Sequence, residues 1–141
     1  MRSKFNSPQR KKDKPVIDGF TFDSELEARY YVENIKGSPI VNRFVVHPRY
    51  ELLPKTTKHS AVIYIADFEI TYDEGTQEVI DVKGLATETA LLKRKMFEHR
   101  YPNIPLLWMC YSKMDGGWIE YNELQKARAK RKKEKKAKGA V

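Results

Sequence analysis

Two aspartates and a lysine lie within apolar segments that predict neighbouring β-strands. Asp67 follows Ile65-Ala66, and Asp81 lies two residues before Lys83 in a second apolar segment. Because side chains alternate along a strand, Asp81 and Lys83 are expected to point to the same face. Two carboxylates on adjacent strands can share a divalent cation, and a lysine beside them can orient or deprotonate a water. This combination indicates metal-assisted hydrolysis of phosphodiester bonds.

The elements that would position these residues form a hairpin. Residues 61–72 and 77–84 are rich in β-branched and aromatic side chains, and the acidic, glycine-containing turn 73–76 separates them. Asp is a poor strand former, so a carboxylate inside an apolar strand needs a partner, and a metal ion would be one. The simpler alternative is that Asp81 and Lys83 are neighbours without a function on the exposed face of an antiparallel strand.

The remaining segments predict one domain with the order helix, three strands, helix, strand. Ser24 as N-cap, with Glu27 three residues later, predicts a helix that Gly37-Ser38-Pro39 ends. Residues 42–53 predict an extended segment, in which Pro48 indicates an edge strand or a bulge. After the hairpin, residues 87–100 predict a helix and residues 104–111 a buried strand that is central or parallel to its neighbour. Residues 118–121 then close the sheet or dock on it, and Asn122 caps a final helix.

The positive charge of the chain is concentrated at its ends. The net charge is +8, but residues 1–14 hold six Lys or Arg against one acid, and residues 126–138 hold nine against one. Residues 15–125 therefore carry 12 basic and 17 acidic side chains, a net charge of −5. Basic ends on an acidic body are typical of a protein that holds a polyanion with its termini, and a solubilising tail is the alternative.

Several other classes of protein find little support in the sequence. Cys110 is the only cysteine, so an intrachain disulfide is impossible, and its apolar surroundings are typical of a buried structural thiol. His47, His59 and His99 lack the spacing of zinc ligands. No apolar run is long enough to span a membrane, and no hydrophobic leader begins the chain. We therefore expect a soluble, cytoplasmic protein with no membrane partner.

Three short motifs follow one another in the chain: Phe22-Asp23-Ser24-Glu25-Leu26-Glu27, Tyr64-Ile65-Ala66-Asp67-Phe68 and Asp81-Val82-Lys83-Gly84. In this order they resemble the PD-(D/E)XK nuclease superfamily, with a closer likeness to small phage Holliday-junction-resolvase-like endonucleases over residues 18–112. The resemblance implies an α/β, restriction-endonuclease-like core of a helix, a three-stranded antiparallel meander, a helix and a strand. The expected divisions of the chain are a flexible basic N-terminal arm (1–17), the nuclease domain (18–121) and a Lys/Arg-rich C-terminal helix or tail (122–141).

The resemblance also implies roles for individual residues. Asp67 and Asp81 would ligate the metal, and Glu27 would reach the same site from its helix. Lys83 would position or activate the attacking water, and the backbone carbonyl of Val82 would complete the coordination. Mg²⁺ is the expected ion because the ligands are hard oxygens, with Mn²⁺ as a substitute.

Two features of the motifs leave alternatives open. Glu25 is a rival of Glu27, but it lies about 200° around the helix, so both cannot face the metal, and Glu27 matches the family spacing. Glu27 also has a purely structural role available as the capping-box residue. Close relatives often carry an extra acid before Asp-Val-Lys, where Ile80 stands in this chain.

Basic residues next to the motifs and at both ends are the expected contacts to nucleic acid. They are Lys93, Arg94 and Lys95 on the second helix, Lys11 and Lys12 in the N-terminal arm, and Arg128, Arg131 and Lys132 in the C-terminal segment. By resemblance the substrate is branched DNA, cut during phage DNA recombination, replication or packaging in the host cytoplasm. A homodimer is expected because a resolvase cuts two strands symmetrically. The alternatives are a DNA-binding accessory protein whose nuclease fold has lost its activity, and a basic protein associated with ribosomes or RNA.

Overall fold

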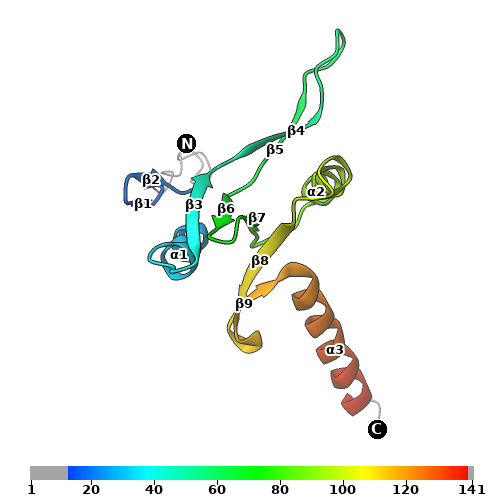
Figure 1. Ribbon diagram of the computed structural model, residues 1–141. Coiled ribbons are helices and arrows are strands. Elements are labelled where there is room, and N and C mark those ends of the chain that lie inside the picture. The colour runs from blue at the N-terminus through cyan, green and yellow to red at the C-terminus, as the bar shows by residue number, and fades with distance from the viewer. Residues whose placement is uncertain (1–12, 140–141) are drawn as a thin grey trace, which may run out of the picture.

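The computed structural model describes residues 13–139, which form a mixed α/β fold with a five-stranded sheet and three α-helices (Figure 1). The strands of the sheet, in spatial order, are β3 (Val41–Val46), β6 (Phe68–Tyr72), β7 (Gln77–Val82), β8 (Leu106–Ser112) and β9 (Gly117–Glu120). Neighbouring strands are antiparallel except β7 and β8, which are parallel. A parallel pair needs a crossover connection, and a helix supplies it here.

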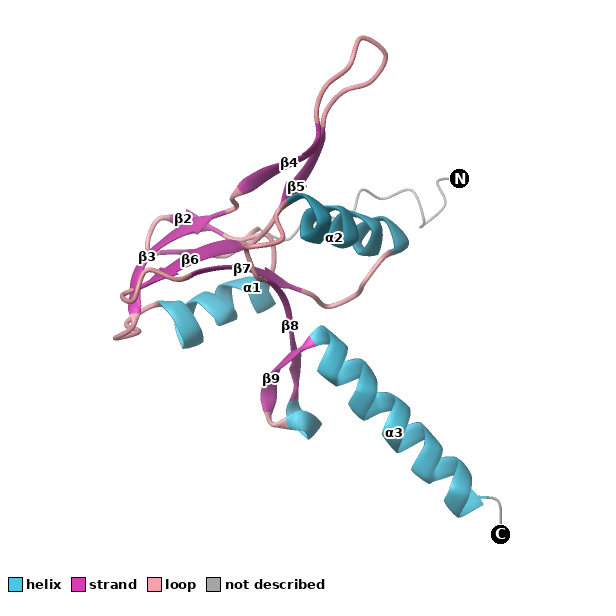
Figure 2. Ribbon diagram, turned by 45° about the vertical axis from the view of Figure 1, so that its right-hand side comes forward, coloured by secondary structure: helices cyan, strands magenta, loops and turns pink. Residues whose placement is uncertain are grey.

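Two helices cover opposite faces of the sheet (Figure 2). They are α1 (Glu25–Tyr30), continued by the π-helix η2 (Tyr31–Ile35), and α2 (Glu88–Arg100). Val79 and Ile80 are adjacent in β7, so their side chains point to opposite faces. Ile80 belongs to the buried cluster around α1, whereas Val79 packs in a second cluster that includes Phe97 of α2. Each face of β7 is therefore buried under its own helix.

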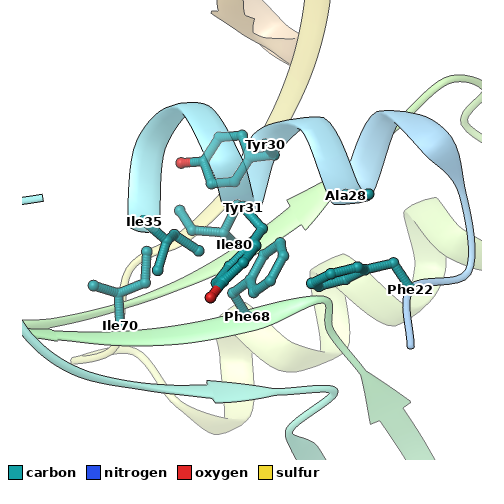
Figure 3. Close-up of a cluster of buried hydrophobic side chains, with 8 residues drawn as sticks. All are labelled: Phe22, Ala28, Tyr30, Tyr31, Ile35, Phe68, Ile70 and Ile80. Carbon is teal, nitrogen blue, oxygen red and sulfur yellow. The ribbon is translucent and has the colours of Figure 1, made fainter. Parts of the chain in front are cut away.

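Aromatic side chains hold α1 against the sheet (Figure 3). The ring of Phe68 in β6 has two aromatic neighbours, Phe22 just before α1 and Tyr30 at its end, with centroids 6.0 and 5.8 Å away. Phe22 and Phe68 are fully buried, and each such side chain contributes about 1.5–3 kcal/mol. This packing fixes the short helix that carries Glu27.

A two-stranded ribbon, β4 (Arg49–Leu53) with β5 (Val62–Ile65), extends beyond the sheet (Figures 1 and 2). We call residues 49–65 the β4–β5 ribbon. Tyr50 and Tyr64 lie opposite each other in it, and both contact the ring of Phe97, at centroid distances of 5.0 and 5.6 Å. These contacts hold α2 against the base of the ribbon.

The predicted hairpin is confirmed in part. The turn 73–76 connects β6 and β7 as predicted, and Gly75 adopts the left-handed conformation that it requires, with φ of +91°. The prediction of one continuous strand over residues 61–72 is wrong, because the chain bends at Ala66-Asp67. Before the bend β5 pairs with β4, and after it β6 pairs with β3 and β7. Asp67 therefore lies at a strand break, and the antiparallel meander consists of β3, β6 and β7.

The first helix and the extended segment form where the sequence predicts them. The Ser24 hydroxyl accepts a hydrogen bond from the Glu27 N–H at 3.1 Å, which confirms the predicted N-cap. Pro48 marks the break between β3, an edge strand of the sheet, and β4. α2, capped by Thr87, and β8, parallel to β7, also agree with the predictions.

The last helix, α3 (Tyr121–Gly139), projects from the body (Figure 1). Its first half is anchored by the buried Leu124 and by Arg131, whose Nη1 lies 2.6 Å from Oδ1 of Asp115 in the short helix η3 (Lys113–Asp115). Asn122 does not cap this helix as predicted but lies in its first turn, because the helix begins at Tyr121. None of the helices described between residues 13 and 139 is long and apolar enough to cross a membrane.

The N-terminal side of the domain begins with a small hairpin. β1 (Val16–Ile17) pairs with β2 (Phe20–Thr21), and Ile17 packs against the cluster around α1. Folded structure therefore starts before residue 18, where the domain boundary was expected. Residues 1–12 of the expected basic arm, with Lys11 and Lys12, lie outside the described residues, as do residues 140–141.

Candidate metal centre

The strand break at Asp67 is held by backbone hydrogen bonds on both sides. The Asp67 N–H donates to the Ile80 carbonyl at 3.1 Å, and the Asp67 carbonyl accepts from the His47 N–H at 3.0 Å. The Asp67 side chain accepts from the Val82 N–H, with an N to Oδ2 distance of 2.6 Å. These three bonds fix a carboxylate at the point where the β4–β5 ribbon leaves the sheet.

Asp67 belongs to a cluster of four side chains with Asp23, Glu27 and His47. One potential ligand atom from each lies within 4.8 Å of the other three. Nε2 of His47 is 2.7 Å from Oε1 of Glu27 and 3.5 Å from Oδ2 of Asp23. Carboxylate oxygens suit Mg²⁺ and Mn²⁺, and an imidazole is a ligand of transition metals. The donor set of the cluster therefore fits a divalent cation.

Glu27 has two structural partners in this cluster. It is only 2% exposed, and its Oε2 accepts a hydrogen bond from the Asp23 N–H at 3.2 Å. Burial raises the pKa of Glu27, and the neighbouring His47 opposes this rise. Glu27 thus bonds the N–H of the residue before the N-cap, rather than the Ser24 N–H that a capping box uses, and also belongs to the cluster.

Asp81 and Lys83 form a second group beside Asp67. Nζ of Lys83, the residue after β7, lies 3.1 Å from Oδ2 of Asp81, which confirms that the two side chains point to the same side. The Tyr64 hydroxyl donates to the same oxygen, and it accepts from the Trp108 indole N–H at 3.0 Å. Asp81 is 5% exposed, so this network positions a buried carboxylate with little freedom to move.

Asp67 is repelled by carboxylates of both groups, Glu27 in the cluster and Asp81 in the second group. Burial, together with repulsion from the nearby carboxylates of Asp81 and Glu27, raises the pKa of Asp67 to about 9. Three crowded carboxylates keep a proton among them unless another positive charge is present. A divalent cation would supply that charge and displace the proton.

The structure brings most of the predicted site residues together. Glu27 and Asp67 share the four-residue cluster, and Asp81 with Lys83 lies next to it, although Asp81 is not a member of the cluster. The Val82 N–H donates a hydrogen bond to the Asp67 carboxylate. The sequence instead predicts that the Val82 carbonyl is a metal ligand.

Asp23 and His47 are the cluster residues that the sequence analysis missed. Asp23 directly precedes the N-cap, so the same motif that identifies Glu27 contains it. His47 has a left-handed backbone with φ of +54°, which is uncommon for a residue other than glycine and often marks a functional position. The only signal in the sequence is its place before Pro48, at the expected bulge.

The family described as "Protein of unknown function (DUF1064)" matches residues 2–116. The chain belongs to this family. No curated protein and no solved structure matches this chain. The DUF1064 region contains both groups of the candidate metal centre and α2, and it ends before α3.

Within the DUF1064 region, the three predicted basic contacts on α2 have different surroundings. Nζ of Lys93 donates to the Ile63 carbonyl at 3.2 Å, so this side chain supports the β4–β5 ribbon. The Arg94 guanidinium stacks on Trp108, 4.4 Å from the ring centroid. Lys95 is exposed. Of these three, Lys95 has the side chain that is most accessible to a phosphate.

Beyond the DUF1064 region, α3 brings one predicted basic contact close to the site. A cleft of about 310 Å³ lies between α3 and the loop after β7, and both Lys83 and Arg128 line it. Arg131 pairs with Asp115, and Lys132 is exposed. The cleft therefore connects the candidate metal centre to the basic helix.

Proposed function

We propose that this protein is a metal-dependent endonuclease that hydrolyses phosphodiester bonds in DNA. The observation that carries the proposal is the group of buried carboxylates around Asp67, with Glu27 on one side and Asp81 paired with Lys83 on the other. In this proposal the order α1, β3, β6, β7, α2, β8 is a restriction-endonuclease-like core, and the chain is a divergent PD-(D/E)XK nuclease.

Each residue of the site would have a separate role. Asp67, Asp81 and Glu27 would hold a Mg²⁺ ion, for which Mn²⁺ can substitute, and His47 would orient Glu27. When bound, this ion would neutralise the charge that develops on the phosphate oxygens. The ammonium group of Lys83, held by Asp81 at 3.1 Å, would orient the attacking water toward the phosphorus.

We extend the proposal to branched DNA as the substrate and to a homodimer that acts in phage DNA recombination, replication or packaging. The basic α3 and the cleft shared by Lys83 and Arg128 support a nucleic-acid substrate. The choice of branched DNA, and with it the need for two symmetric cuts, rests on the resemblance of the three motifs.

The test is a cleavage assay on labelled four-way junction, flap, single-stranded and linear duplex DNA, with Mg²⁺, with Mn²⁺ and with EDTA. Asp81→Asn and Lys83→Ala are each expected to lower the metal-dependent rate by about 10²–10⁴-fold. The matched controls, Asp73→Asn in an exposed turn and Lys113→Ala in η3, should cut like the wild type.

Two results would reject this function. If the wild-type protein binds DNA but cuts none of these substrates, the protein is a DNA-binding accessory protein with a nuclease-like fold. If Asp81→Asn retains the full rate, the carboxylate group is not where the chemistry occurs.

A further inference from the structure

The β4–β5 ribbon ends in a loop, residues 54–61, that the proposed mechanism does not use (Figures 1 and 2). Residues 52–66 contain no Asp or Glu, but they contain Lys55, Lys58 and His59. The domain around them, residues 15–125, carries a net charge of −5. The end of the ribbon is therefore a positively charged projection on an acidic body.

Hydrogen bonds within the loop fix its shape. The Thr56 N–H donates to the His59 carbonyl at 2.9 Å, and the Thr56 hydroxyl accepts from the N–H groups of Lys58 at 3.3 Å and His59 at 3.0 Å. Lys55 and Lys58 are exposed, and neither takes part in an ion pair with the rest of residues 13–139. A loop that is already ordered loses less conformational entropy when it binds a partner.

β4 starts at the candidate metal centre and β5 ends there. His47 lies two residues before β4, and Asp67 lies two residues after β5. The Ala66 N–H donates to the Pro48 carbonyl at 3.1 Å and closes the base of the ribbon. Thr57 at the loop is ten residues after His47, and an extended chain rises about 3.3 Å per residue, so the loop reaches at most about 33 Å from the site.

The end of α2 extends this positive surface beside the ribbon. A mostly apolar groove of about 540 Å³ lies between α2 and β4, and Lys95, His99 and Arg100 of α2 are among its lining residues. These three basic or titratable side chains are exposed. The loop and the end of α2 thus present positive charge along one side of the molecule, away from α3.

We propose that the β4–β5 ribbon binds a DNA duplex up to about one helical turn away from the bond that is cut. A two-stranded ribbon fits the major groove of B-DNA, which is about 12 Å wide. Lys55 and Lys58 would pair with phosphates at the edges of the groove, and the end of α2 would contact the nearer backbone. Only the position of the cut in this proposal rests on the proposed function, because the contact itself needs no cleavage.

The test uses the full chain and two double variants that lose the same charge. The ribbon variant is Lys55→Ala with Lys58→Ala, and the matched control is Arg43→Ala with Lys113→Ala, two exposed basic residues elsewhere on the body that form no ion pair with the rest of residues 13–139. Binding is measured by fluorescence anisotropy in EDTA, so that no DNA is cut. The two probes are duplexes of about 40 and about 6 base pairs, the second closed as a hairpin; at about 3.4 Å per base pair they are longer and shorter than the span of at most about 33 Å between the ribbon and the site.

We expect the ribbon variant to bind the long duplex about five- to tenfold more weakly than the control variant, and the short duplex equally well. The slope of log K against log salt should fall by about 1.8 for two lost phosphate contacts. Equal affinities of the two variants for the long duplex, or the same loss on both lengths, would overturn the proposal.

Light scattering would show whether the ribbon binds a second copy of the chain instead of DNA. If only the ribbon variant changes its mass in light scattering, the loop contacts a second copy of the chain, and the proposal is wrong. A wild-type protein that cuts nothing in the cleavage assay rejects the proposed function, whereas the anisotropy result still decides the role of the ribbon.

Discussion

The imidazole of His47 lies against the carboxylate of Glu27, with Nε2 2.7 Å from Oε1. The two residues are 20 positions apart and come from different elements, the β3–β4 bend and α1. Glu27 is buried, and its other oxygen is held by a backbone N–H. His47 therefore restricts the rotation of the Glu27 carboxylate, which lies beside Asp67 in the cluster.

Replacing His47 by Ala is expected to weaken metal binding about 10–100-fold, because groups that orient metal ligands have effects of this size. His47→Gln, which keeps a hydrogen-bond donor near Glu27, should recover part of the loss. Isothermal titration of Mn²⁺ into the protein without DNA measures both variants. Unchanged affinity in His47→Ala would show that Glu27 needs no such support.

The pKa of Asp67, about 9 in the folded protein and 3.8 for an ordinary Asp, makes the metal-free protein sensitive to pH. The folded state keeps a proton that the unfolded state releases, so the free energy of unfolding should fall as the pH rises from about 4 to about 9. Asp67→Asn cannot ionise, and we expect it to be more stable than the wild type by about 1–3 kcal/mol at about pH 8 in EDTA. Urea denaturation at several pH values measures the difference.

Metal addition provides the control for this prediction. Mg²⁺ or Mn²⁺ should stabilise the wild type, because a ligand that binds only the folded state shifts the equilibrium toward it. Asp67→Asn should gain much less. Parallel pH curves for the two proteins in EDTA would mean that Asp67 ionises normally.

Local patterns were enough to predict part of the site and of the fold. Alternation along one strand places Asp81 and Lys83 on one face, and their 3.1 Å contact follows from it. The N-cap at Ser24 likewise fixes where α1 starts and how Glu27 is oriented. Each of these features depends on residues fewer than five positions apart.

Features that depend on distant pairing could not be predicted. Residues 61–72 have strand-forming side chains on both sides of Asp67, and only the choice of β4 as a separate partner for β5 ends the first strand. His47 joins the cluster because the chain turns before Pro48, and nothing in its immediate neighbours indicates a contact with Glu27. The ribbon, and the basic surface that it makes with α2, follow from the same long-range pairing.

Tyr64→Phe tests the hydrogen-bond network behind Asp81. The variant removes the donor to Asp81 and the acceptor of the Trp108 indole N–H. We expect a loss of about 1–3 kcal/mol in the free energy of unfolding and a cleavage rate about tenfold lower. Tyr72→Phe, which removes a hydrogen bond to Glu78 far from the site, should affect stability but not cleavage. Equal cleavage by the two variants would exclude Tyr64 from positioning Asp81.

A chain that ends after Arg131 keeps the first half of α3, which packs on the body, and lacks the exposed second half. Residues 132–139 are exposed, whereas Leu124 and the Arg131–Asp115 pair remain in the shortened chain. The free energy of unfolding should therefore stay within about 0.5 kcal/mol of the full-length value. The lost segment carries five lysines, so DNA affinity should fall for every sequence tested and its salt dependence should become shallower. A large loss of stability in urea denaturation would instead mean that the second half of α3 packs on the body, and its lysines would then not be free to bind phosphates.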